Sequence, residues 1–310
     1  MDINAANFQS IPKADSNFRS GFVAIIGRPN VGKSTLMNLL VGQKIAITSP
    51  VAQTTRNRLR GILTTDQAQI IFVDTPGIHK PHHQLGKILV KNAINSIQSV
   101  DLVLFLVDCS VKAGGGDRYI IELLETTSTP VILGLNKVDQ QTDAELDKSY
   151  IELIEKHKWP CVKFSALEGT GTTELQYSLI ENLETGPYYY PPELVTDQPE
   201  RFIMGELIRE QILYLTKQEV PHSVAVQIEQ VEETPKITRV MAAINVERDS
   251  QKGIIIGSKG VMLKAIGQAA REQIQKLIAG DVYLQLFVKV EPKWRQSRMM
   301  LSELGYREEN

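Results

Sequence analysis

The sequence predicts a doubly wound α/β domain followed by a smaller α+β domain, and three observations support this fold class. Apolar, strand-like runs alternate with helix-length segments from residue 20 to about residue 182. A proline-rich segment without periodicity interrupts the alternation, and beyond it the predicted order is helix, strand, strand, helix, helix, strand. We therefore expect a flexible tail over residues 1–19, the α/β domain over 20–183, a linker over 184–200, and the α+β domain with a C-terminal tail over 201–310.

Five runs in the first domain are almost continuously apolar: GFVAIIG, AQIIFVD, DLVLFLVD, PVILGLN and CVKFSA. Such runs are typical of parallel strands that are buried on both faces of a sheet. The segments between them have helical length and spacing, as in LGKILVKNAINSIQ. Because ligands of doubly wound sheets bind beyond the carboxyl ends of the strands, the residues that follow each run are candidates for a site.

The composition is that of an ordinary globular protein, with 42% hydrophobic and 23% charged residues and a net charge of −2. The longest apolar stretches, such as residues 102–107, are too short to span a bilayer, and the N-terminal segment has acidic residues without an apolar core. These features predict a cytoplasmic protein. Cys109 and Cys161 lie in apolar, strand-like surroundings without metal-ligand spacing, so we expect two buried thiols in a reducing compartment.

A glycine-rich loop, GRPNVGKS, follows the first strand and opens a helix. In that context backbone N–H groups converge on a phosphate at the helix N-terminus. Lys33 would reach the β- and γ-phosphates of a nucleotide, and the Ser34 hydroxyl would bind Mg²⁺. The alternative is a purely structural strand–helix turn. Phosphate contacts are expected from Gly27, Arg28, Pro29, Asn30, Val31, Gly32, Lys33, Ser34 and Thr35.

The second apolar run ends in DTPG, about 40 residues after the phosphate loop. The carboxylate of Asp74 would hold Mg²⁺ through water, and the N–H group of Gly77 would sense a γ-phosphate. The alternative is a turn that merely ends a strand, because this sequence is good turn chemistry by itself. Its place after a phosphate loop favours a site made of Asp74, Thr75, Pro76, Gly77 and Ile78.

A third motif, NKVD, follows another apolar run and predicts which base is bound. A carboxylate at Asp139 accepts two hydrogen bonds from guanine, from N1–H and the exocyclic amine, whereas adenine would present an acceptor to it. Ser165 and Ala166, after the next strand, would offer a backbone N–H to the guanine oxygen. The alternative is a solvated turn. Guanine contacts are expected from Asn136, Lys137, Val138, Asp139, Ser165 and Ala166.

These motifs, in this order and spacing, resemble those of the translation-factor-related GTPases. The sequences QTTR at 53–56, YYYP at 188–191, and RF at 201–202 followed by IRE at 208–210 resemble the bacterial Era family specifically. The resemblance covers residues 20 to 306 and implies a P-loop GTPase domain followed by a type II KH domain. It also implies that Thr55, rather than the adjacent Thr54, closes on Mg²⁺ and the γ-phosphate. The catalytic set is then Lys33, Thr55 and Gly77, and the metal set is Ser34, Thr55 and Asp74.

The position at which many GTPases carry a water-orienting glutamine holds Ile78 instead. His79, His82 and His83 follow, but we interpret them as loop residues, so the intrinsic rate of hydrolysis should be slow. A partner, a reordered loop or a monovalent cation would then stabilise the transition state. The amide oxygen of Asn30 is a candidate ligand for potassium. The alternative is that Asn30 only ties the loop by hydrogen bonding to the first switch, the segment that contains QTTR at 53–56.

A Gly-x-x-Gly turn in the second domain lies between a short and a longer predicted helix, within the order αββααβ. In a KH domain such a turn lets a single-stranded nucleic-acid backbone approach closely. Nearby cations, including Arg271, either meet phosphates or form a solvated helix face. Trp294 either stacks on a base or packs under the domain. RNA contacts are expected from Lys252, Gly257, Ser258, Lys259, Gly260 and Lys264.

The sequence therefore predicts a monomeric switch that binds GTP and GDP, hydrolyses GTP with Mg²⁺, and binds single-stranded RNA. The Era resemblance implies that the RNA is the 3′ end of 16S rRNA and that the protein acts in assembly of the small ribosomal subunit. The alternative function is a membrane-associated signalling GTPase whose C-terminal domain binds protein or lipid. That alternative would add peripheral contact with the inner membrane.

Overall fold

The structure, a computed structural model, describes residues 11–49, 55–56, 59–78, 84–143, 145–216, 220–278, 280–304 and 306. The chain forms two compact units, each described here by itself. Unit 1 comprises Met1–Ile45, Arg58–His79 and Asn92–Asp197; unit 2 comprises Ala46–Asn57, Lys80–Lys91 and Gln198–Asn310. Two segments from the first half of the chain thus group with the C-terminal domain, which differs from the continuous boundaries that the sequence suggested.

Unit 1 contains a six-stranded sheet with the order β2-β3-β1-β4-β5-β6. All neighbours in it are parallel except β2, which is antiparallel to β3. This sheet confirms the predicted doubly wound α/β fold, although the sequence did not reveal the edge strand β2. The strands are β1 (Arg19–Ile26), β2 (Leu59–Thr64), β3 (Ala68–Asp74), β4 (Leu102–Asp108), β5 (Val131–Asn136) and β6 (Cys161–Lys163).

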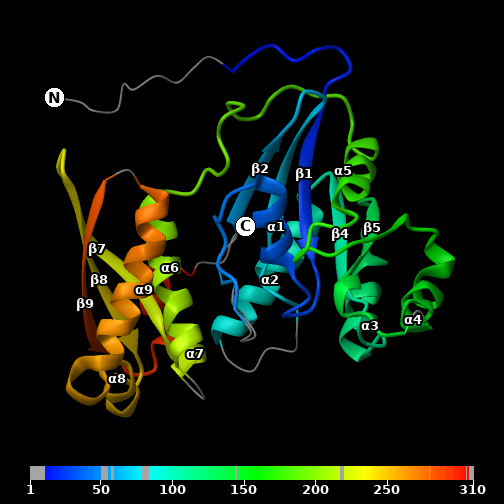
Figure 1. Cartoon of the computed structure of the whole chain (residues 1–310). Coiled ribbons are helices and arrows are strands. Elements are labelled where there is room, and N and C mark those ends of the chain that lie inside the picture. Colours follow the sequence, from blue (N-terminus) through cyan, green and yellow to red (C-terminus); the bar gives the residue numbers. More distant parts are fainter. Residues whose placement is uncertain are drawn as a thin grey trace. The chain divides into compact units, whose positions relative to one another are not determined.

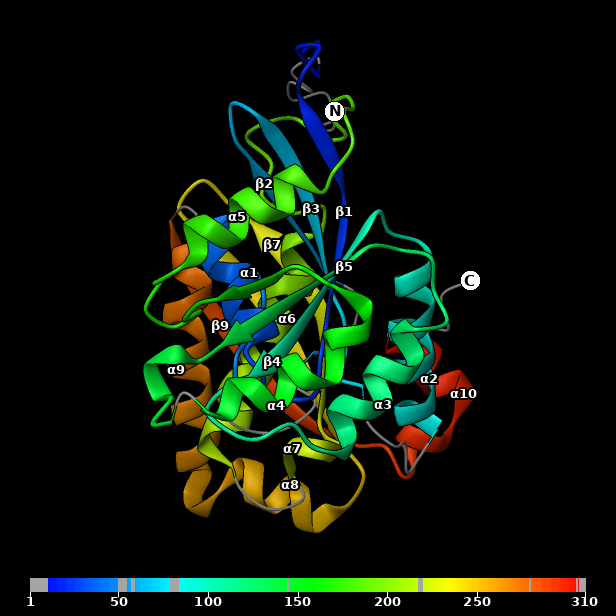
Figure 2. The same cartoon turned by 90° about the vertical axis from the view of Figure 1, so that its right-hand side faces the viewer.

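Helices cover both faces of this sheet (Figures 1 and 2). The face with α2, α3 and α4 is filled by apolar side chains of β1, β4 and β5, such as Ile26, Phe105 and Leu133. The opposite face carries α1 and α5 (Figure 2). The helices are α1 (Lys33–Val41), α2 (Gln84–Gln98), α3 (Gly115–Leu124), α4 (Glu145–Ile154) and α5 (Thr172–Glu181), with short 3₁₀ turns at Val138–Gln140 and Glu155–His157.

The end of the predicted tail and most of the predicted linker are built into unit 1. Phe18 is only 3% exposed and its ring contacts that of Tyr188, and Arg19 already belongs to β1. The side-chain amide oxygen of Gln69 on β3 accepts hydrogen bonds from the backbone N–H groups of Tyr189 and Tyr190. These aromatic contacts depend on tertiary packing, so neither composition nor periodicity could reveal them.

Unit 2 contains a three-stranded sheet in which β8 pairs with β7 antiparallel and with β9 parallel. Helices α6 and α9 pack on one face of the sheet, around Ile208, Ile244 and Ile266 (Figure 1). The αββααβ order predicted from the sequence is confirmed. The elements are α6 (Glu200–Leu215), α7 (Val220–Ser223), β7 (Ala225–Glu233), β8 (Ile237–Val246), α8 (Asp249–Ile256), η3 (Ser258–Gly260), α9 (Val261–Leu277), β9 (Asp281–Val290), η4 (Trp294–Gln296) and α10 (Arg298–Glu303).

Trp294 packs inside unit 2, so of the two alternatives for this residue the structural one holds. Its side chain is fully buried, its indole N–H donates to the carbonyl oxygen of Ser223 at 2.9 Å, and its ring stacks on Tyr306. An indole held in this way has no face open to a base.

The thiol of Cys109 is buried as predicted, but the prediction for Cys161 was wrong because that residue is exposed. Cys161 begins the short strand β6, which lies at the edge of the sheet where one side stays open to solvent. Along the described parts of the chain, no helix combines the length and apolarity needed to cross a membrane.

Candidate nucleotide and RNA sites

The phosphate loop joins β1 to α1 through a backbone that bends into the left-handed region twice, at Asn30 (φ 64°) and Gly32 (φ 100°). A Cβ atom at Gly32 would lie 2.3 Å from the side-chain nitrogen of Asn136, so only glycine fits there. Helix α1 begins directly afterwards, at Lys33. Successive N–H groups of such a bend, placed at a helix N-terminus, form a concave anion site.

Lys33 lies within this loop and is 7% exposed. Its ammonium donates to the carbonyl oxygens of Arg28 at 2.9 Å and Gly27 at 3.4 Å. Burial lowers the pKa of Lys33 to about 8, although the neighbouring carboxylate of Asp74 opposes this change. The loop thus holds a desolvated cation that gains from any anion placed beside it.

Ser34 and Asp74 form the part of the predicted magnesium site that the structure brings together. The Ser34 hydroxyl donates to Asp74 Oδ2 at 2.8 Å, and Asp74 is fully buried at the end of β3. Hydroxyl and carboxylate oxygens are the hard donors that Mg²⁺ prefers, so these residues fit the ion. Thr55, the third predicted ligand, groups with unit 2, and Thr54 lies outside the described residues.

The segment after β3 lies directly on the phosphate loop. The backbone N–H of Ile78 donates to the carbonyl oxygen of Gly27 at 3.2 Å. A Cβ atom at Gly77 would lie 2.7 Å from the backbone nitrogen of Pro29, so glycine permits this close approach. Thr75 ties the segment to β1, since its hydroxyl donates to the carbonyl oxygen of Ile25 at 2.9 Å. Pro76 between them is buried as well.

Ile78 does not point into solvent as a water-orienting residue would. It is 1% exposed and packs in the apolar layer between the sheet and α2, α3 and α4. The three histidines that follow it in the sequence, His79, His82 and His83, lie outside the described residues. The side chain at the glutamine position is therefore part of the core.

The predicted guanine-binding residues come from two loops of unit 1 and are bonded to a third, the phosphate loop. The Asn136 amide donates to the carbonyl oxygen of Val31 at 2.8 Å and accepts from the backbone N–H of Ala166 at 2.8 Å. The Ser165 hydroxyl donates to the Asp139 carboxylate at 2.5 Å. These bonds join the phosphate loop and the base motif into one frame, with Val138 in the 3₁₀ turn beside Asp139.

Asp108 and Asp117, which lie in no recognised motif, support this frame through ion pairs with motif residues. The ammonium of Lys137 pairs with the carboxylate of Asp108 at 2.7 Å, at the end of the neighbouring strand β4. The guanidinium of Arg28 pairs with the buried carboxylate of Asp117 at 2.8 Å. The only sequence signal for Asp117 is its place after three glycines, which suits a helix start.

The Gly-x-x-Gly turn of unit 2 is sharp, with positive φ at Gly257 (69°), Lys259 (52°) and Gly260 (79°). A Cβ atom at Gly257 would lie 2.7 Å from Cβ of Met262, so this glycine is required. Ser258 and Lys259 are exposed at the tip of the turn. Lys252 on α8 is half-buried, and Lys264 on α9 is exposed.

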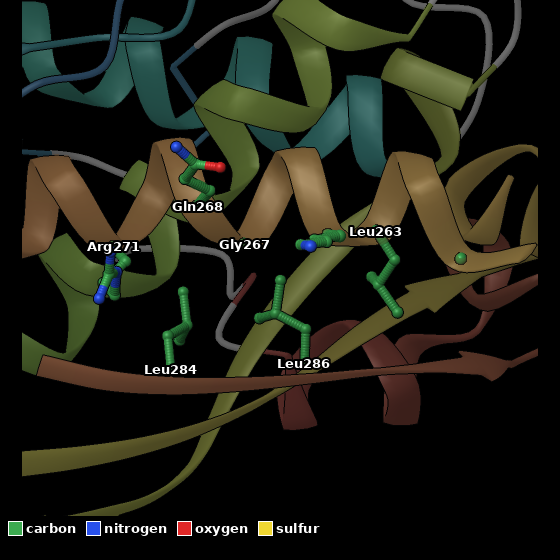
Figure 3. A pocket seen from close by; sticks show the side chains of 8 residues that line it. Leu263, Gly267, Gln268, Arg271, Leu284 and Leu286 are labelled. Atoms are coloured by element: carbon green, nitrogen blue, oxygen red, sulfur yellow. The ribbon is translucent and has the colours of Figure 1, made fainter.

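A groove of about 490 Å³ begins at Gly260 and runs between α9 and β9. Figure 3 shows Leu284 and Leu286 rising from β9 toward the helix that carries Leu263 and Arg271. The groove therefore has an apolar floor with cationic groups on its helical wall. The sequence alone did not indicate this floor, because β9 has the pattern of an ordinary half-buried strand. The lining residues are Gly260, Leu263, Lys264, Gly267, Gln268, Arg271, Leu284 and Leu286.

Comparisons with known families agree with this two-part organisation. A family described as 50S ribosome-binding GTPase matches residues 22–137, and a family described as KH domain matches residues 219–295. The first range contains the phosphate loop and the first residues of the base motif. The second contains the Gly-x-x-Gly turn and the groove.

Proteins named GTPase Era match the whole chain. The one from Crocosphaera subtropica is 73% identical over 99% of both chains, and that from Synechocystis is 69% identical over the full length of both. The solved structure of a single-residue variant of Aquifex aeolicus Era bound to GDP·AlF₄⁻ has a TM-score of 0.89 and 38% identity, covering 93% of this chain and 99% of its own. Era in complex with MgGDPNP and nucleotides 1506–1542 of 16S rRNA has a TM-score of 0.90 with the same identity and coverage. This chain belongs to the Era family of GTPases.

Proposed function

We propose that this chain is a GTP-hydrolysing switch whose KH domain binds the 3′ segment of 16S rRNA during assembly of the small ribosomal subunit. The observation that carries the proposal is that one chain combines two arrangements of residues, each of which suits one of these ligands. Unit 1 holds a phosphate loop bonded to a guanine-specific motif through Asn136, and unit 2 holds a cationic, apolar-floored groove behind a sharp glycine turn.

The chemistry of the first site follows from the charges around the phosphate loop. Lys33 and the loop N–H groups would bind the β- and γ-phosphates, and Asp139 would accept from guanine. Ser34, Asp74 and Thr55 would hold Mg²⁺, which neutralises phosphate charge when bound. The N–H group of Gly77 would meet the γ-phosphate. These roles are the ones that the sequence motifs predict. The contacts within unit 1 support the roles of Lys33, Ser34, Asp74, Gly77 and Asp139, whereas the role of Thr55 rests on the family resemblance.

The chemistry of the second site suits single-stranded RNA. The sharp turn at 257–260 would let the RNA backbone come close, with Lys252, Lys259 and Lys264 near its phosphates. The leucine floor would take unstacked bases, which avoid water. An Era relative is bound to nucleotides 1506–1542 of 16S rRNA in a solved complex, and we propose the corresponding RNA as the partner here.

The test introduces two carboxylates into the turn by substitution. Ser258 and Lys259 are exposed, so their replacement together by Asp should leave the fold intact while it repels the RNA backbone. We expect affinity for an oligonucleotide of the 16S 3′ end to fall at least about 100-fold, with GTP affinity unchanged. The matched control replaces Gln275 and Lys276, exposed at the far end of α9, with Asp. Unchanged RNA affinity in the turn variant would move the RNA site elsewhere on the chain.

A further proposal concerns the slow reaction expected with Ile78 in the core. We propose that Asn30, which the left-handed backbone places in the middle of the phosphate loop, is a ligand for potassium. The ion would stabilise charge on the oxygen between the β- and γ-phosphates. Turnover should then be faster in potassium chloride than in sodium chloride at equal ionic strength, and Asn30→Ala should remove most of the difference. Equal rates in both salts at saturating GTP would leave Asn30 with a purely structural role.

The proposed RNA partner would place the protein's activity in the cytoplasm. The monomeric state remains a prediction, and so does peripheral contact with the inner membrane. Both are open to measurement, by light scattering of the purified protein and by co-sedimentation with vesicles of inner-membrane lipids.

A further inference from the structure

The side chain of Arg28 leaves the phosphate loop and reaches the start of α3. Its Nε–H donates to Asp117 Oδ1 at 2.8 Å, and the other carboxylate oxygen accepts from the N–H of Gly114 at 2.8 Å. Asp117 is fully buried, whereas Arg28 is partly exposed. A Cβ atom at Gly116 would lie 2.7 Å from Cδ of Arg28, so the stem of the arginine lies in space that a glycine leaves open.

The backbone around Arg28 contacts the residues that are predicted to meet the γ-phosphate. Its carbonyl oxygen accepts from the ammonium of Lys33 at 2.9 Å. The residues on either side contact the segment after β3, since Gly27 accepts from the N–H of Ile78 and Pro29 lies against Gly77. A tether on the side chain of Arg28 therefore fixes a three-residue backbone segment that supports both Lys33 and Gly77.

Helix α4, whose Tyr150 lies near the pair of Arg28 and Asp117, is connected to the base motif. Tyr150 on α4 is 1% exposed, and its hydroxyl donates to the carbonyl oxygen of Asp108 at 2.9 Å. Burial, and secondarily the Asp117 carboxylate, raises the pKa of Tyr150, while the Arg28 guanidinium opposes this rise. Asp108 in turn pairs with Lys137. Helices α3 and α4 thus form a scaffold that is bonded to both ends of the nucleotide site.

We propose that Arg28, held by Asp117, is a positioning residue for the γ-phosphate of GTP. The inference rests on the proposed GTPase function. The guanidinium is directed at Asp117, and the pair keeps the loop backbone where Lys33 and Gly77 meet the phosphate. Preorganised charge of this kind lowers the barrier because no reorganisation is needed as charge develops. GDP lacks the γ-phosphate, so its binding depends much less on this segment.

The experiment compares binding of GDP with binding of a non-hydrolysable GTP analogue, together with kcat. Asp117→Asn keeps an amide oxygen that can accept from Gly114 but removes the charge that holds Arg28, and Arg28→Met keeps the stem without the guanidinium. Loss of one charge-assisted hydrogen bond should weaken analogue binding and lower kcat by about ten-fold, and change GDP affinity by less than about two-fold.

Asp147→Asn is the matched control, because Asp147 is also a buried carboxylate on a helix of unit 1, paired with Lys163. That variant should leave the ratio of analogue to GDP affinity unchanged. The Arg28→Met and Asp117→Asn double variant should lose no more than either single variant, since both break one pair.

An equal loss of GDP and analogue affinity would overturn the inference and leave Asp117 as a helix cap alone. Unchanged binding and kcat in both variants would overturn it too. Failure of the proposed function is a separate result, in which the wild-type protein itself neither binds nor hydrolyses GTP. Arg28→Lys checks the geometry: its ammonium keeps the charge without the planar donor, so it should restore only part of the preference for the analogue.

Discussion

Single residues of the phosphate site combine burial with charge, and Lys33 is the clearest case. The residue is almost fully buried. Its ammonium donates to two carbonyl oxygens and lies near the carboxylate of Asp74. Because burial disfavours the charged form, its pKa falls from 10.5 to about 8. The buried cation therefore destabilises the nucleotide-free protein, and a bound phosphate would offset this destabilisation.

We predict that Lys33→Met stabilises the nucleotide-free protein at pH 7 by up to about 3 kcal/mol in the free energy of unfolding. The sign follows from linkage: between a folded pKa of about 8 and an unfolded pKa of 10.5, the unfolded chain binds more protons, so wild-type stability rises with pH. The advantage of the variant should therefore shrink above pH 8. Urea unfolding at pH 7 and about pH 9.5 measures it, with exposed Lys148→Met as control; a gain that is independent of pH would contradict the prediction.

Asp139 provides a second test at this scale, because its carboxylate is held by the Ser165 hydroxyl beside the frame that Asn136 builds. We predict that Asp139→Asn shifts preference from GTP to xanthosine triphosphate, since xanthine has a carbonyl where guanine has its amine and an amide can donate to it. Competition binding with both nucleotides measures the shift. Comparable GTP affinity in variant and wild type would remove Asp139 from the base site.

At the scale of elements, the sequence predicted the strands whose hydrophobic pattern is set by burial on both faces. Strands β3, β4 and β5 are covered on both faces, so their apolar runs are continuous and could be recognised. The edge strand β2 was missed because it includes the half-exposed Arg60 and owes its conformation to pairing with β3. Asp117 and the leucines of the groove were missed for a related reason, since only tertiary contacts give them a role.

The chain segment between α1 and β2 illustrates such a contact inside unit 2. Arg56 is 3% exposed, and its guanidinium donates to the carbonyl oxygens of Val224 at 2.6 Å and Pro221 at 3.0 Å. Two carbonyl groups at fixed positions suit the planar fork of arginine better than a single ammonium. Arg56 therefore anchors this segment to the turn between α7 and β7.

We predict that Arg56→Lys lowers the free energy of unfolding by about 2–3 kcal/mol, because a buried carbonyl loses its charged partner. Denaturant unfolding measures the loss, and amide exchange at Ala225 locates it. Arg60→Lys is the matched control, since the Arg60 guanidinium pairs with Asp197 but is 36% exposed and should contribute less than about 1 kcal/mol. Losses of similar size in the two variants would contradict an anchoring role for Arg56.

At the scale of the whole molecule, the sequence predicted two domains, their order and their motifs, but not the grouping of residues 46–57 with the second unit. That grouping depends on contacts between residues more than 160 positions apart. Thr48, for example, donates through its backbone N–H and its hydroxyl to the carboxylate of Glu210, at 2.9 and 3.4 Å. A local pattern contains no information about such a pair.

This grouping predicts that nucleotide and RNA binding are coupled. The segment 46–57 connects α1, which carries Ser34, to β2, yet Thr48 and Arg56 are bonded to residues of unit 2. A change of bound nucleotide that moves this segment must therefore disturb contacts within the unit that contains the proposed RNA groove. The coupling is reciprocal: the factor by which the GTP analogue changes RNA affinity, relative to GDP, equals the factor by which RNA changes the preference for the analogue over GDP. Coupling factors of about 5- to 150-fold are typical.

The two bonded residues make the coupling testable. Glu210→Gln keeps the size of the side chain but weakens its bonds to Thr48, and Arg56→Lys loses the fork at Val224 and Pro221. Each should lower the coupling factor while binding of RNA alone and of GDP alone stays near wild type, whereas Arg60→Lys should leave it unchanged. Titrations of RNA at saturating GDP or analogue, and the reverse titrations, measure both sides of the cycle. Equal RNA affinity in the two nucleotide states of the wild type would show that these bonds only stabilise unit 2, because a ligand shifts an equilibrium only through a difference in affinity.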